Sequence, residues 1–330
     1  MGLLKPLCHL SRLLDLPPSM ARSLRDIRRK MKAIKSTRQV TKAMELVAAS
    51  KMRKAVQHAQ QLRRYALHAW EILLSIGRTH AQGHPFLIQR KVKRVLGIVI
   101  TSDRGLCGSL NAQLLRSLQQ YIKSVSALKS FEGIDFITVG RKGHQMLTRQ
   151  GFDVIATFPA LSNHPSIKDV TPITKLAIDD FLADKYDHVV IVYTDFISPI
   201  VQQAAVKVLL PFSPSEVREV LGHLSEQRRE FKEEEEIKRS DVGTVQEYLF
   251  EPSPTEVMNI ILPQLTETQV FQAVLESVAS EHSARMLAMH NATDNASEIL
   301  DDITLTYNQT RQANITAELA ELSASKASME

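Results

Sequence analysis

Residues 23–55 read SLRDIRRKMKAIKSTRQVTKAMELVAASKMRKA. They belong to a stretch that contains neither Gly nor Pro between Pro18 and Gly77. A second stretch of this kind follows Pro263 and continues to the last residue. Because Gly costs about 1 kcal/mol and Pro about 3 kcal/mol inside a helix, the two stretches predict very long helices at the two ends of the sequence.

Both stretches repeat apolar or small residues at alternating intervals of three and four, which is the spacing of a coiled-coil seam. The first helix is expected over about 21–76, ended by Gly77, and at 1.5 Å per residue it would be roughly 80 Å long. Its expected seam contains Leu24, Ile27, Met31, Ile34, Thr37, Val40, Met44, Val47, Met52, Ala55, Ala59, Leu62, Ala66, Ala69, Leu73 and Ile76.

The second long helix is expected over about 266–323. A short helix that opens at Ser253 should precede it, and Pro263 should interrupt that short helix. The expected seam of the second helix contains Phe271, Leu275, Val278, Met289, Ala292, Ala296, Ile299, Ile303, Ile315, Leu319 and Leu322. The segment 304–314 is polar for a seam, so we expect it to face solvent or a partner.

The two helical stretches carry opposite charge. Residues 20–64 contain 14 Lys and Arg against two acids, and residues 264–330 contain ten acids against three basic residues. The net charges are therefore +12 and −7, which suits two antiparallel helices that pack against each other, although each exposed ion pair contributes little.

The middle of the chain has the pattern of an α/β domain. RVLGIVITS (94–102) and DHVVIVYTDF (187–196) are continuous β-branched runs, as buried parallel strands require. QAAVKVLLPF (203–212) predicts an antiparallel strand at the sheet edge. Strands that alternate with helices indicate an α/β layer fold. The expected strands are 94–102, 135–140, 153–158, 187–196, 203–212 and 248–252, and the expected helices are 110–125, 142–150 and 172–184.

The sequence therefore predicts a Rossmann-like α/β central domain combined with a long antiparallel coiled coil of the two terminal helices. The expected division is an extension (1–19, disordered or an over-extended start), an N-terminal helix (20–77), the α/β domain (85–252, with a polar loop at 213–247) and a C-terminal helix (253–330).

Composition and motifs exclude several functions. The two cysteines, Cys8 and Cys107, form neither a disulfide framework nor a metal-ligand spacing. No run of 18 or more apolar residues occurs, so the sequence predicts no membrane-spanning helix. We expect no catalytic residue, cofactor or metal site, and His80 and His84 are interpreted as surface residues of a loop.

Two other functions stay open at this point. DRGLCGSLN (103–111) follows a strand as a phosphate-binding loop would, but it lacks the Lys and the spacing of known nucleotide motifs. It is better interpreted as a tight turn in which Gly supplies positive φ. The basic stretch 20–54 could bind nucleic acid, but its apolar seam and the acidic second helix favour pairing within the chain.

Three segments resemble the gamma subunit of F-type ATP synthases, and the pattern is closest to bacterial forms. They are residues 23–55, TSDRGLCGSLN (101–111) and ASEHSARMLAMHNATDNASEILDDITLTYNQTRQANITAELAEL (279–322). The cysteine-bearing insert of chloroplast forms is absent, since no Cys occurs near 200–250. Residues 1–19 and 213–247 have no counterpart that we can match.

The resemblance implies a central rotor shaft that couples proton-driven rotation of the c-ring to ATP synthesis and hydrolysis, and that regulates ATPase activity and proton flow. The implied partners are the alpha and beta subunits, the epsilon subunit and the c-ring, with no nucleic acid. The implied location is the cytoplasmic side of the cell membrane, as a peripheral protein. The resemblance also implies coupling roles for Met44, Arg285, Gln312, Thr316 and Glu318. Arg311 and Gln312, in the polar stretch 304–314, are the residues that we most expect to contact a partner. Seam packing alone would also account for Met44.

Overall fold

The computed structural model describes residues 24–80, 84–161, 165–212 and 253–327. The chain divides into two compact units, which are described one at a time. The helical unit contains 24–43 and 290–327, and the sheet unit contains the described residues of 44–289. The expected extension 1–19, the polar loop 213–247 and the strand 248–252 lie outside the described residues.

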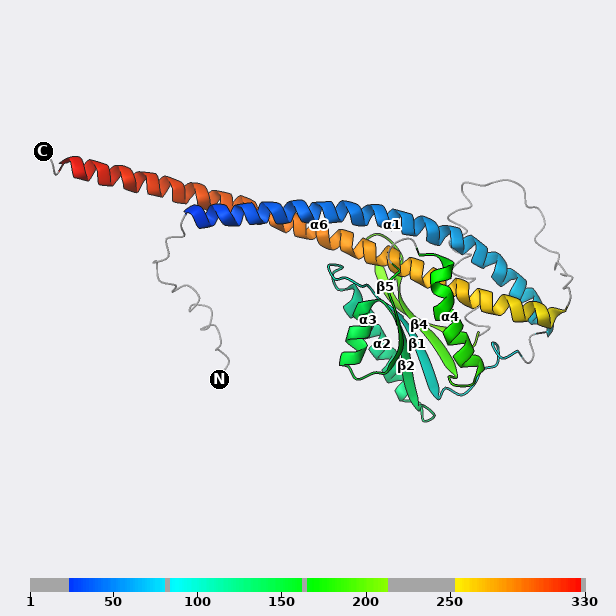
Figure 1. Cartoon of the computed structure of the whole chain (residues 1–330). Helices are drawn as coiled ribbons and strands as arrows, with labels where there is room; N and C mark the ends of the chain where they lie inside the picture. Colours follow the sequence, from blue (N-terminus) through cyan, green and yellow to red (C-terminus); the bar gives the residue numbers. More distant parts are fainter. Residues whose placement is uncertain (1–23, 81–83, 162–164, 213–252, 328–330) are drawn as a thin grey trace, which may run out of the picture. The chain divides into compact units, whose positions relative to one another are not determined.

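The element order confirms long terminal helices around an α/β domain (Figure 1). The elements are α1 (Leu24–His80), β1 (Arg94–Ile100), α2 (Leu110–Ser126), β2 (Gly133–Val139), α3 (Arg141–Arg149), β3 (Val154–Phe158), α4 (Ile167–Leu182), β4 (His188–Phe196), β5 (Gln202–Leu210) and α6 (Pro254–Ala327).

Three predicted helix boundaries were wrong. Helix α1 continues through Gly77 to His80, since one Gly costs only about 1 kcal/mol in a helix. Helix α6 is continuous through Pro263. Its neighbours Leu262 and Leu265 are buried, and burying each such side chain contributes about 1.5–3 kcal/mol, enough together to offset the cost of one Pro.

Helix α4 begins at Ile167, five residues before its expected start. The missed signal is a capping box, in which the backbone N–H of Ser166 donates to Asp169 Oδ2 at 2.9 Å and the Ser166 side chain accepts the backbone N–H of Asp169. Pro172, which we expected at the start of the helix, lies inside it.

The sheet has the strand order β3-β2-β1-β4-β5. The first four strands are parallel, and β5 runs antiparallel to β4 at one edge, as predicted. The chain moves outward from β1 through β2 to β3 and then returns to place β4 on the other side of β1. Because crossovers between parallel strands are right-handed, this reversal puts α4 on the opposite face of the sheet from α2 and α3.

Side chains alternate between two buried faces of the sheet. On one face, the side chains of β1 that include Leu96 and Ile98 pack in one core with residues of α4, α6 and α1. On the other face, Val99 packs with residues of α2 and α3. Figure 1 shows α2 and α3 on the one side of the sheet and α4 and α6 on the other. Burial of both faces explains why the strands are continuously apolar.

The helical unit is an antiparallel pair formed by the start of α1 and the end of α6. The guanidinium of Arg28 donates to Tyr307 Oη at 2.7 Å and lies 5.6 Å from the centre of its ring. Thr293 Oγ1 donates to Thr41 Oγ1 at 2.8 Å. Thirteen residues forward along α1 thus correspond to fourteen residues backward along α6, which establishes the antiparallel direction.

The seam of α1 keeps a strict three-four spacing, but not always with the expected residues. The positions that are buried or half-buried at this spacing are Leu24, Ile27, Met31, Ile34, Arg38, Thr41, Glu45, Ala48, Met52, Ala55, Ala59 and Leu62. The expected seam residues Val40, Met44 and Val47 are instead 50%, 40% and 56% exposed. Helical geometry therefore selects Arg38, Thr41 and Glu45 for the seam even though more apolar residues lie beside them.

The end of α6 deviates from the expected seam in the same way. Leu300 is half-buried while its neighbour Ile299 is exposed. Within the expected polar segment, Thr304, Tyr307 and Thr310 are half-buried. From Arg311 to Lys326 every residue is exposed, including the expected seam residues Ile315, Leu319 and Leu322.

The seam assignment can be tested at two adjacent residues of α1. Ala48 is 2% exposed, so Ala48→Leu should force extra carbon atoms into a packed region and lower the free energy of unfolding by about 1–3 kcal/mol. Val47→Leu, the control at the exposed neighbour, should change it by less than about 0.5 kcal/mol. Urea unfolding of the full chain measures both. Equal losses in the two variants would contradict the assignment.

Candidate functional site

The carboxyl ends of parallel strands are where open α/β sheets bind ligands, at the point where the strand order reverses. In this sheet the reversal lies between β1 and β4. The segment 101–109 connects β1 to α2 at that point. This edge is therefore the place where a nucleotide would be expected if the domain bound one.

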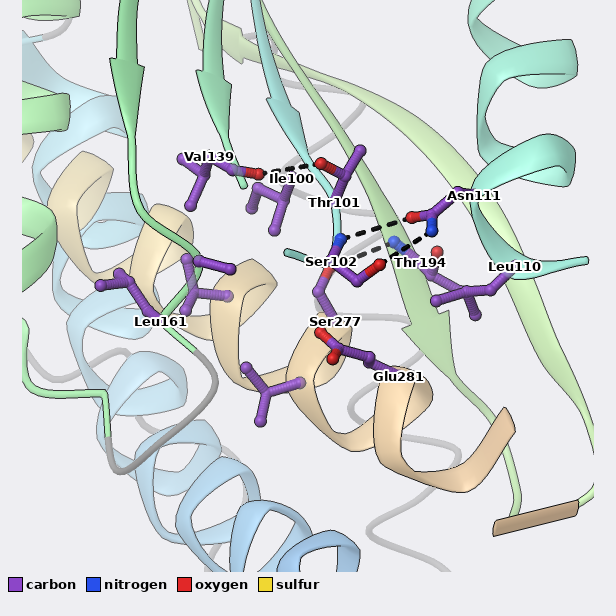
Figure 2. Close-up of a pocket in the computed structure, with 13 residues that line it drawn as sticks. Ile100, Thr101, Ser102, Leu110, Asn111, Val139, Leu161, Thr194, Ser277 and Glu281 are labelled. Carbon is purple, nitrogen blue, oxygen red and sulfur yellow. Dashed lines mark hydrogen bonds between the residues drawn. The ribbon is translucent and has the colours of Figure 1, made fainter. Parts of the chain in front are cut away.

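The cavity at this edge is small. It has a volume of about 20 Å³, which is room for about one water molecule, whereas small-molecule sites measure about 300–1,000 Å³. Its lining residues from the strand ends and α2 include Ile100, Thr101, Ser102, Asn111 and Thr194, and those from α6 include Ser277 and Glu281. Figure 2 shows Glu281 and Ser277 extending from α6 toward the strand ends.

Helix α6 occupies the space that a ligand would need. The backbone N–H of Thr194 in β4 donates to Ser277 Oγ at 3.3 Å, and Ser280 Oγ donates to Thr194 O at 3.1 Å. One turn further on, Gln202 Nε2 donates to Ser283 Oγ at 3.2 Å. Small hydroxyl side chains let the helix approach the strand ends closely and satisfy their backbone groups.

The turn 101–109 is held by its own side chains. Ser102 Oγ donates to Arg104 O at 2.8 Å and accepts from Asn111 Nδ2 at 2.8 Å. The Asp103 carboxylate accepts the backbone N–H of Arg141 at 2.9 Å, at the start of α3. A carboxylate of the protein itself thus occupies this helix N-terminus, which in phosphate-binding proteins is open to the ligand.

The backbone of this turn enters the left-handed region twice. Gly108 has φ +59°, which agrees with the predicted role of Gly in a tight turn. Leu106 has φ +66° and a side chain that is 60% exposed. A left-handed, exposed Leu is uncommon, and no residue pattern predicted it.

A buried ion pair links the turn to α6. Glu281 Oε1 accepts from Arg285 Nη2 at 2.8 Å, and the two side chains are 9% and 16% exposed. The same nitrogen donates to Gly105 O at 3.3 Å. Burial raises the pKa of the Glu281 carboxyl above its usual value, and the nearby Arg285 cation opposes that rise only in part.

The expected site residues lie on both units. Met44 and Arg285 belong to the sheet unit, Met44 exposed and Arg285 in the ion pair. The other four belong to the helical unit and are exposed near the end of α6: Arg311, Gln312, Thr316 and Glu318. Thr316 Oγ1 donates to Gln312 O at 2.9 Å. Met44 does not pack in the seam, so seam packing does not explain why an apolar residue occupies this position.

Sequence reasoning missed Glu281 and misjudged His84. The Glu281–Arg285 spacing of four residues on a helix is itself a signal for an ion pair. His84 is buried rather than on the surface. Its Nδ1 accepts the N–H of Phe86 at 3.2 Å, so Nε2 carries the proton and donates to Asn259 Oδ1 at 3.0 Å. His84 therefore fastens the segment that precedes β1 to α6.

The part of the chain that the structure describes contains neither a candidate metal site nor a candidate membrane-spanning helix. No group of three or more His, Cys, Asp or Glu is placed to hold a metal ion there. None of the helices there has the length and apolar character needed to cross a membrane.

Comparison with known proteins gives consistent matches over most of the chain. The family model described as ATP synthase matches residues 23–329. The ATP synthase gamma chain of Roseiflexus sp. (strain RS-1) is 37% identical over 93% of this chain and 98% of its own length. That of Trichlorobacter lovleyi is 38% identical over 91% of this chain and 96% of its own length.

Solved structures share the fold. A chain of the Euglena gracilis mitochondrial ATP synthase, in a structure of OSCP, F1 and c-ring, has a TM-score of 0.60 at 20% identity and covers 93% of this chain and 94% of its own length. A chain of the Tetrahymena thermophila central stalk and c-ring structure has a TM-score of 0.53 at 26% identity, over 77% of this chain and 99% of its own length. From its sequence and its fold together, the chain belongs to the family of ATP synthase gamma chains.

Proposed function

We propose that this chain is the central shaft of an F-type ATP synthase, which transmits rotation of a c-ring to a catalytic ring of alpha and beta subunits. The observation that carries the proposal is the exposure of Val40, Met44 and Val47 on α1. They are spaced by four and three residues and so share one face of the helix. A helix that keeps apolar residues out of its own seam presents them to a partner.

A shaft works by contacting the states of its partner unequally. A ligand shifts an equilibrium between conformations only by the difference in its interaction free energy with them. As the shaft turns, the apolar face of α1 would contact each beta subunit in succession. At the same moment the other exposed faces of α1, which carry Lys and Arg, would contact the neighbouring subunits of the ring. This asymmetry would drive each catalytic site through its binding states.

The other proposed contacts follow from the family. The epsilon subunit and the c-ring would bind the sheet unit, so that the chain lies at the cytoplasmic side of the cell membrane as a peripheral protein. The exposed end of α6, from Arg311 onward, would contact the catalytic ring, with Gln312, Thr316 and Glu318 as coupling residues. The chain itself would catalyse nothing.

Co-purification tests the assembly. A tagged copy of the full chain, expressed in its own cells, should bring down alpha and beta subunits in a complex that hydrolyses ATP. Recovery of the chain without these subunits would overturn the proposal.

The coupling role of Met44 can be tested by Met44→Lys in the intact complex. A cation at an apolar contact changes the relative energies of the shaft positions, so ATP-driven proton pumping should fall by at least about tenfold more than ATP hydrolysis, which corresponds to about 1.4 kcal/mol. Met44→Leu, which conserves volume, is the control and should leave both rates within about twofold. Equal losses of pumping and hydrolysis would remove Met44 from coupling.

The non-catalytic role predicts an outcome for the chain alone. A cavity of about 20 Å³ cannot take a nucleotide, and α6 fills the edge where one would bind. Equilibrium dialysis with labelled ATP should therefore detect no binding at or below about 1 mM, which is a free energy of only about −4.1 kcal/mol. Binding in that range that is lost on Ser102→Trp would instead support the nucleotide-binding alternative.

A further inference from the structure

We propose that Glu281 is a positioning residue that holds Arg285 against the turn 101–109 and so latches the sheet edge to α6. The proposal goes beyond the family's role and rests on the proposed function only for its consequence in coupling. It starts from the contacts of one guanidinium group, whose Nη2 bonds to Glu281 Oε1 at 2.8 Å, to Gly105 O at 3.3 Å and to Arg104 O at 3.5 Å.

Among these acceptors, Glu281 alone shares the helix with Arg285. It lies one turn before Arg285, and both side chains are largely buried. A carboxylate at this spacing fixes the direction of the Arg side chain. Without it, the long Arg side chain would be free to place its charge in water, as such side chains do at surfaces. The bonds to Arg104 O and Gly105 O would then be lost.

The electrostatics favour a role in geometry over a role in stability. Burial disfavours the ionised Glu281 carboxylate more than Arg285 favours it, so its pKa is raised. Of the other charged groups around it, Asp103 in the turn raises the pKa further and Lys51 of α1 lowers it. His282 Nδ1 lies 3.4 Å from Arg285 Nη1. A buried ion pair of this kind often adds little to the free energy of unfolding. Its role is then to favour one conformation of the contact between the turn and α6.

The latch acts at the strained part of the turn. It holds the carbonyls of Arg104 and Gly105, directly before Leu106 with its φ of +66°. Ser102 Oγ holds Arg104 O from the other side at 2.8 Å. Fixed on both sides, the turn keeps the exposed Leu106 side chain in one orientation. In a rotating shaft, the same latch would make the sheet edge and α6 move as one body.

The experiment compares three variants with the wild-type chain in the assembled complex. Glu281→Ala removes the carboxylate, Glu281→Asp retains it at a spacing that still permits an ion pair, and Glu132→Gln is the control. Glu132 forms an exposed pair with Lys93 at 3.8 Å, which should matter little. Amide hydrogen exchange of the peptide 103–109 measures the latch, and protons pumped per ATP hydrolysed measure coupling.

Glu281→Ala should accelerate exchange in 103–109 by about tenfold or more, because charge-assisted hydrogen bonds are lost, and should lower the pumping ratio. Glu281→Asp should keep the exchange rate and the pumping ratio close to those of the wild-type chain. Glu132→Gln should change neither the exchange rate nor the pumping ratio. Unchanged exchange in Glu281→Ala would overturn the latch. Faster exchange with an unchanged pumping ratio would overturn its role in coupling.

If Glu281→Ala prevents assembly, Glu281→Gln takes its place, since it keeps the volume and removes only the charge. The same acceleration confined to 103–109 would support the latch, and its absence would refute the latch. Failure of the proposed function is a separate outcome. It would appear in the wild-type chain, as a failure to co-purify with alpha and beta subunits.

Discussion

The contact between α6 and the carboxyl ends of β1 and β4 is the interaction on which the sheet unit depends. A sheet of this kind normally leaves that edge open for a ligand. Here Ser277 and Ser280 bond to the backbone of Thr194, and Arg285 bonds to the backbone of the turn 101–109. A sheet with the topology of a nucleotide-binding domain thereby binds a helix of its own chain, and the edge where a ligand would bind is an intramolecular packing interface.

Much of this architecture is encoded locally and could be predicted. The continuous β-branched runs at 94–102 and 187–196 identified two parallel strands, because a sheet covered on both faces needs apolar side chains at every position. The absence of helix breakers identified α1 and α6. Predictions failed where packing outweighs a local preference. Pro263 stays helical because burial of its neighbours Leu262 and Leu265 offsets its cost. Gly77 stays helical because one Gly costs only about 1 kcal/mol.

The candidate site was harder to predict because its residues are chosen by three-dimensional geometry. The seam of α1 follows helical spacing into Thr41 and Glu45 and leaves Met44 exposed, a result that no count of apolar residues would give. Glu281 and the backbone of Gly105 are far apart in sequence and meet through Arg285. Gln312, Thr316 and Glu318 were identified by family resemblance and Arg311 by the polar stretch that contains it, because all four are exposed and no packing pattern marks them.

The hydroxyl pair of Thr41 and Thr293 has a further consequence for the helical unit. A hydrogen-bonded polar pair inside a seam sets the register of two helices. If α1 slid along α6 by one heptad, the two hydroxyls would separate and Arg28 would leave Tyr307. Sliding is therefore opposed by hydrogen bonds that only one alignment can form. The two helices of the helical unit therefore favour one register over its heptad-shifted alternatives.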